Sequence, residues 1–94
     1  MVKAIWKGKV IAESDESEEL ENNYYFPMKD VNQKYLKKSD SHTTCPWKGE
    51  ASYYDVVVDG EVNKDAAWYY LSPSDMAKKI KGHVAFWRGI KIVE

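Results

Sequence analysis

The sequence predicts a small, mainly β domain in which antiparallel strands form two packed sheets or a barrel-like structure, with one α-helix in the C-terminal half. Short runs rich in Val, Ile, Tyr and Trp are separated by Gly-containing turns, which is typical of antiparallel strands. Asp59-Gly60, between two such runs, is a strong hairpin signal. Only one stretch carries both a helix start and a helix stop. The 94 residues make a single domain, residues 1–94.

The first strands are predicted from apolar runs on either side of Gly8. Residues 2–6 and 10–13 form a hairpin that turns at this glycine. An acidic segment follows and leads into an edge strand at about residues 18–22.

A third strand is expected at residues 24–26, where two tyrosines precede a phenylalanine. Pro27 ends it, because proline has no N–H for the ladder. Asp30 can then cap a short helical turn at about residues 31–36. The small polar residues 39–44 form a loop or the start of a strand.

The central strand is expected at residues 51–59, followed by the turn at Gly60 and further strand at residues 61–64 and 66–71. Side chains alternate along a strand, so Ala51, Tyr53, Asp55 and Val57 share one face, and Ser52, Tyr54, Val56 and Val58 share the other.

The predicted helix covers about residues 73–81. Ser72 can cap it, Pro73 fits its first position, and Gly82 ends it. Two strands follow, at residues 83–87 and 90–93.

Charge and cysteine content exclude several classes of protein. The net charge is −1 with both signs spread along the chain, so we expect no nucleic-acid partner and no anionic membrane partner. The single cysteine cannot form an internal disulfide. No apolar run is long enough to span a membrane, and the N-terminus lacks an apolar signal core. We therefore expect a soluble, cytoplasmic protein.

Cys45 is the first candidate for chemistry. As a nucleophile it would need a lowered pKa and a base within reach, and His42 is the nearest histidine in the sequence. Three residues along a strand span about 10 Å, however, and Cys45 can equally be a small, inert residue beside Pro46. A zinc site needs a second ligand pair, and only His83 remains, so no metal is expected. No glycine-rich phosphate loop is present, so no cofactor is expected.

Charged residues offer further candidates. Lys48 and Arg88 could each hold an anion or could be ordinary surface cations. Among the carboxylates, Asp30 is explained by capping and Asp59 by its turn, whereas Asp55 could take an inward polar position.

Aromatic residues make up 14% of the chain, more than so small a core can hold. Strand alternation should direct roughly half of them outward or into a cavity. Rings that line a concave β surface beside a few polar groups make a pocket for a planar or cationic ligand, although a core with an amphipathic rim is the alternative.

The chain resembles the family called domain of unknown function 427, sometimes labelled a nucleotidyltransferase domain. The resemblance rests on Tyr25-Phe26-Pro27, on the run Thr44-Cys45-Pro46-Trp47-Lys48-Gly49-Glu50-Ala51-Ser52-Tyr53, on Ala67-Trp68-Tyr69-Tyr70 and on Val84-Ala85-Phe86. It implies a β-tent fold: two antiparallel sheets joined at one edge and open at the other. Methionine sulfoxide reductases of the B type and the thalidomide-binding domain of cereblon are similar in architecture. The two C-x-x-C zinc pairs of many β-tent proteins are absent here.

The function expected from these observations is binding of a small molecule or a peptide segment in an aromatic-lined cleft between the sheets. Tyr25, Tyr53, Trp68 and Tyr70 would supply the walls and Lys48 an anion contact. The alternative is an enzyme, either nucleotidyltransferase-like or thiol-based, with Cys45, Lys48 and Asp30 as candidate catalytic residues. A third possibility is pairing through an exposed sheet edge, for instance as a homodimer.

Overall fold

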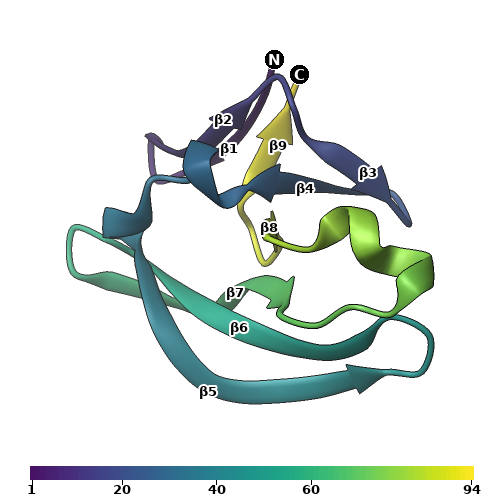
Figure 1. Cartoon of the computed structure of the whole chain (residues 1–94). Helices are drawn as coiled ribbons and strands as arrows, with labels where there is room; N and C mark the ends of the chain where they lie inside the picture. Colours follow the sequence, from purple (N-terminus) through teal and green to yellow (C-terminus); the bar gives the residue numbers. More distant parts are fainter.

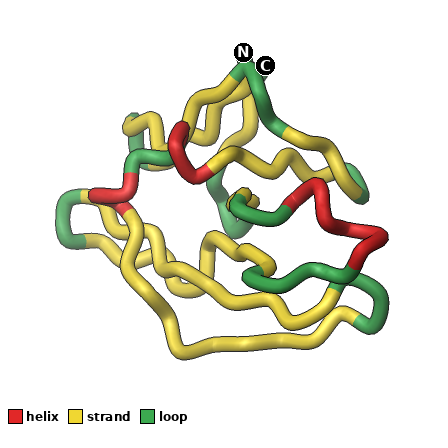
Figure 2. Tube along the Cα trace, in the orientation of Figure 1, coloured by secondary structure: helices red, strands yellow, loops and turns green.

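A computed structural model describes all 94 residues, which form two antiparallel sheets and three short 3-10 helical turns (Figures 1 and 2). The three-stranded sheet has the order β2-β1-β9, with β1 at Val2–Trp6, β2 at Lys9–Ser14 and β9 at Lys91–Val93. The six-stranded sheet has the order β3-β4-β8-β7-β6-β5. Its strands are β3 (Glu18–Leu20), β4 (Asn23–Pro27), β5 (Leu36–Cys45), β6 (Gly49–Val58), β7 (Glu61–Tyr70) and β8 (His83–Phe86).

The predicted mainly β, two-sheet class is confirmed, and the barrel-like alternative is wrong. A closed barrel would need its two outermost strands to pair. Here β3 and β5 are the two edges of the large sheet, and neither pairs with the other. None of the helices is long and apolar enough to cross a membrane.

The main core lies between the small sheet and one face of the large sheet. Ile11 from β2 is fully buried against Phe26, Val56 and Val84 from the large sheet. Chain termini lie together at the small-sheet end, whereas β5, β6 and β7 spread away from it (Figure 1). The Asn32 N–H donates to the Ile11 carbonyl at 2.8 Å and ties the small sheet to the segment after β4.

A second apolar cluster lies on the opposite face of the large sheet. Neighbouring residues of a strand point to opposite faces, so Tyr25 belongs to this cluster whereas Phe26 belongs to the main core. The 3-10 helix η3 (Asp75–Ile80) covers the second cluster with buried Ala77 and Ile80. This second face carries the cavity described below.

The predicted α-helix at about residues 73–81 is wrong in type and start. Only η3 forms there, and Ser74, not Ser72, precedes its first residue. The Ser74 hydroxyl does not cap the helix; it donates to the Trp47 carbonyl at 2.5 Å, and the Ser74 N–H donates to the Lys48 carbonyl at 2.9 Å. These bonds hold Ser74 against the β5–β6 turn with an extended backbone (ψ of 165°), so no α-helix begins at Pro73.

The helical turn expected at about residues 31–36 is replaced by two 3-10 turns, η1 (Met28–Asp30) and η2 (Gln33–Tyr35). Asp30 caps neither of them, because its carboxylate accepts a hydrogen bond from the Ser14 hydroxyl at 2.6 Å. Residues 39–44, for which a loop was one expectation, lie inside the ten-residue strand β5.

The faces predicted for the central strand agree with the structure: Ala51 and Tyr53 contribute to the second cluster, whereas Tyr54 contributes to the main core. The β6–β7 register shifts between Tyr54 and Val56. At this irregularity the buried Asp55 carboxylate accepts the Asp65 N–H at 2.9 Å, which explains the inward polar position.

Candidate functional site

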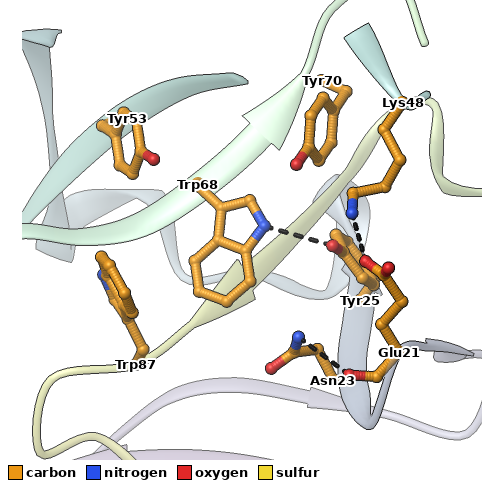
Figure 3. Close-up of a pocket in the computed structure, with 8 residues that line it drawn as sticks. All are labelled: Glu21, Asn23, Tyr25, Lys48, Tyr53, Trp68, Tyr70 and Trp87. Atoms are coloured by element: carbon orange, nitrogen blue, oxygen red, sulfur yellow. Dashed lines mark hydrogen bonds and ion pairs between the residues drawn. The ribbon is translucent and has the colours of Figure 1, made fainter. Parts of the chain in front are cut away.

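A cavity of about 260 Å³ opens on the second face of the large sheet (Figure 3). It combines five aromatic rings with one lysine, one glutamate and one asparagine. The lining residues are Glu21, Asn23, Tyr25, Lys48, Tyr53, Trp68, Tyr70 and Trp87. All five residues expected from the sequence to bind a ligand are therefore in one cavity: Tyr25, Lys48, Tyr53, Trp68 and Tyr70.

Sheet register explains why these rings share the cavity. Tyr53 on β6 pairs directly with Trp68 on β7, and Trp68 pairs on its other side with Ala85 on β8. Directly paired residues of antiparallel strands project from the same face. Ala85 itself is fully buried in the second cluster and does not line the cavity.

The two tryptophans of the cavity are held by hydrogen bonds at their indole nitrogens. Trp68 Nε1 donates to the Tyr25 hydroxyl at 3.2 Å, and Trp87 Nε1 donates to the Asp65 carbonyl at 2.6 Å. The Trp68 and Trp87 rings meet edge to face, with 5.5 Å between centroids and 70° between planes. With both N–H groups already bonded, the rings offer apolar surfaces in fixed orientations.

Lys48 and Glu21 form an ion pair at one end of the cavity (Figure 3). The lysine side chain is only 8% exposed, whereas the glutamate side chain is 47% exposed. The Lys48 ammonium also lies 4.8 Å from the Trp47 ring centroid and 5.9 Å from that of Tyr70. Lys48 is therefore a buried cation within an aromatic surround, and its surface-cation interpretation is wrong.

The ion pair keeps both groups charged at neutral pH. Burial disfavours the charged ammonium, but hydrogen bonds to Glu21 and to the Cys45 sulfur outweigh this and raise the pKa of Lys48 to about 12. The hydrogen bond from Lys48 lowers the pKa of Glu21. Burial raises the pKa of Tyr70 to about 12, so this phenol stays neutral and can donate or accept a hydrogen bond.

Cys45 interacts with Lys48 and packs against the second cluster, but it does not line the cavity. Burial raises the pKa of its thiol, but the backbone amides of Lys48 and Trp47 and the Lys48 ammonium lower it more, so the net shift is downward. The imidazole of His42 faces Ser52, with Nδ1 3.1 Å from the Ser52 hydroxyl, and makes no hydrogen bond to Cys45.

The remaining candidates lie outside the cavity. Asp30 is bonded to Ser14 at the junction of β2 and η1, so the structure does not bring it together with Lys48 and Cys45. Arg88 stacks on Trp87, with 4.6 Å from the guanidinium carbon to the ring centroid. No three His, Cys, Asp or Glu side chains are grouped so that they could hold a metal ion.

Three lining residues were not among the expected ligand-binding residues: Glu21, Asn23 and Trp87. Glu21 and Asn23 belong to the β3–β4 hairpin, and the fold alone brings this hairpin beside Lys48, 27 residues from Glu21 along the chain. Trp87 follows β8, and alternation from the Trp68–Ala85 pair places it on the same face.

Comparison with curated proteins gives no match to this chain. Comparison with family models gives one that covers nearly its whole length, residues 1–93, and this model describes a domain of unknown function, DUF427. The match agrees with the resemblance carried by the Cys45-Pro46-Trp47-Lys48-Gly49 run, and the chain is a member of the DUF427 family.

Proposed function

We propose that this domain binds a small planar ligand, or a planar side chain of a peptide, in the aromatic cavity. The observation that carries the proposal is the convergence of five rings and one ion pair on a single cavity. Ligand sites in proteins are mostly apolar concavities in which a few polar groups fix orientation. The ring faces would supply the contact area, and the ion pair at one end would orient the ligand.

The size of the cavity limits the ligand. Its volume of about 260 Å³ lies just below the range of most ligand pockets, which run from about 300 to 1,000 Å³. One or two fused rings with a polar substituent fit this space. A peptide would therefore insert one side chain and leave the rest of its chain outside.

Indole N–H resonances in NMR spectra can test the proposal, because the four tryptophans are placed unequally. Trp68 and Trp87 line the cavity, Trp47 contacts Lys48, and Trp6 lies on β1 in the other sheet. Titration with a panel of small aromatic metabolites should shift the Trp68 and Trp87 signals and leave Trp6 unchanged. Shifts confined to Trp6, or absent throughout, would contradict the proposal.

Tyr53 and Tyr54 provide a matched pair of variants. They are neighbours on β6 and both are half-buried, but Tyr53 lines the cavity whereas Tyr54 stacks on Tyr69 and packs against the main core. Tyr53→Ala should weaken binding of any metabolite found by NMR. Tyr54→Ala removes the same atoms from the other face and should leave the affinity of the folded protein unchanged.

Thiol chemistry is a second candidate function, favoured by the position of Cys45 against the Lys48 ammonium. A lowered pKa increases the fraction of thiolate, the nucleophilic form. Rates of iodoacetamide alkylation against pH test it. An inflection below the ordinary cysteine pKa supports a reactive thiol, and a thiol that stays unreactive in the folded protein removes this candidate.

A further inference from the structure

Glu21 and Lys48 are unequal partners. The lysine is nearly inaccessible, whereas almost half of the glutamate side chain faces solvent. Glu21 is the only carboxylate that pairs with Lys48. Removal of this one carboxylate would leave a buried, unpaired cation at the wall of the cavity, which is a costly state that another anion would relieve.

The hairpin that carries Glu21 does not depend on the ion pair. Glu21 and Asn22 form a two-residue turn with φ of 52° and 64°, closed by the Leu20–Asn23 pair, and the Glu21 carbonyl accepts a hydrogen bond from Asn23 Nδ2 at 3.3 Å. Positive φ at both central residues is the geometry of a favoured hairpin turn. The glutamate side chain can therefore rotate toward solvent about its own bonds while the turn keeps its backbone bonds.

Charge at this end of the cavity favours an anionic ligand. A cation would approach the buried Lys48 ammonium and be repelled, and the one nearby carboxylate is already engaged by that ammonium. A ligand carboxylate could instead replace that of Glu21 on Lys48, with its ring against Trp68 and Trp87.

We propose that the cavity binds small aromatic carboxylic acids, and that the Glu21 carboxylate occupies the position of the ligand carboxylate until the ligand displaces it. This inference rests on the proposed function and adds the ligand class. Glu21 thereby acts as an internal competitor: the apparent affinity for the acid is reduced by the fraction of molecules in which Glu21 holds Lys48.

Benzoate, benzamide and benzamidine are suitable probes, because they share one ring and differ in charge. Their affinities can be measured from the shifts of the Trp68 and Trp87 indole signals. We expect benzoate to bind most tightly of the three. Glu21→Gln should increase benzoate affinity about threefold or more, because it removes the competitor. Lys48→Met should decrease benzoate affinity about tenfold or more, because it removes the cation that pairs with the carboxylate. Glu19→Gln is the matched control. Glu19 is exposed on the same hairpin, and its substitution removes the same charge outside the cavity.

Glu21→Asp separates competition from net charge and from any loss of stability in Glu21→Gln. It keeps the negative charge but withdraws the carboxylate by one methylene, so it should also increase benzoate affinity. Three results would overturn the inference but leave the proposed function intact. They are tighter binding of benzamidine than of benzoate, equal binding of benzamide and benzoate, and weaker benzoate binding in both Glu21 variants. If none of the three probes shifts Trp68 or Trp87, the inference fails, and the titration with the metabolite panel then decides separately whether the proposed function stands.

Discussion

Gly49 connects the stability of the fold to the position of Lys48, and its substitution by alanine is our first prediction. Gly49 has a φ of +118°, which lies outside the left-handed region that non-glycine residues can reach. A Cβ atom there would lie 3.3 Å from the Ser72 carbonyl oxygen, a backbone atom that cannot rotate away. Ser72 cannot easily move away from the added Cβ, because the nearby Ser74 is hydrogen-bonded to the β5–β6 turn.

The expected loss of stability has two causes, the positive φ of Gly49 and the close contact of an added Cβ with Ser72. A strained backbone conformation costs about 1 to 3 kcal/mol, and the close contact adds to it, so Gly49→Ala should destabilise the fold by about 3 kcal/mol. Gly8 is the control: its φ is +73° and nothing lies within 4 Å of an added Cβ. Gly8→Ala should therefore cost only about 1 kcal/mol.

Thermal unfolding followed by circular dichroism would compare the two variants. In a domain of this size about 1 kcal/mol shifts Tm by about 4 to 8 °C, so Gly49→Ala should lower Tm by about 12 to 24 °C and Gly8→Ala by about 4 to 8 °C. Equal losses in the two variants would refute the reasoning, because they would show that the contact with Ser72 has no energetic weight.

Three further predictions concern Asp55, Cys45 and Glu21. Asp55→Ala leaves the Asp65 N–H without its acceptor and should lower the free energy of unfolding in urea by about 1 to 3 kcal/mol. Asp55→Asn keeps an acceptor and should lower it less. Equal losses in the two variants would contradict this role of Asp55. Lys48→Met removes the ammonium beside Cys45 and should move the inflection of the alkylation rate to higher pH; an unchanged inflection would contradict the assigned cause. The pKa of Glu21 is lowered on folding, so its contribution to stability is present above the ordinary glutamate pKa and is lost as pH falls through the folded value. The stability difference between wild type and Glu21→Gln should therefore shrink in acid. A difference that is constant with pH would contradict this.

Local signals were enough to predict the turns and most strands. Lys7-Gly8 and Asp59-Gly60 turn where expected, with positive φ at all four residues, because the conformation of a tight turn depends on the residues that form it. The type of the helix could not be predicted in this way. The Ser74 hydroxyl and N–H donate hydrogen bonds to the carbonyl groups of Trp47 and Lys48, and these partners come from another part of the chain.

Strand β5 shows a second limit of sequence patterns. It lies at the edge of the large sheet and pairs only with β6, and its side chains are half-buried or exposed throughout. Alternating apolar and polar residues reveal a strand only where one face is buried. Residues 39–44 therefore carry little sign of the strand that contains them.

Within the cavity, the rings were predictable and the ion pair was not. Alternation along β6 and β7 places Tyr53 and Trp68 on one face, and the sequence alone is enough to infer this. The burial of Lys48 depends on rings of Trp47 and Tyr70 around its ammonium, and its partner Glu21 comes from a separate hairpin. Contacts of this kind depend on how the sheet is assembled.

Adjacent aromatic residues in this sequence supply the two faces of the large sheet. Tyr53 lines the cavity and Tyr54 packs against the main core, and Trp68 and Tyr69 on β7 divide in the same way. A sheet buried on one face and hollowed on the other needs large rings on both, so the high aromatic content serves the core and the cavity separately. Truncation of Tyr69 should therefore reduce stability and leave the ligand affinity of the folded protein unchanged, whereas truncation of its neighbour Trp68 should reduce both stability and ligand affinity.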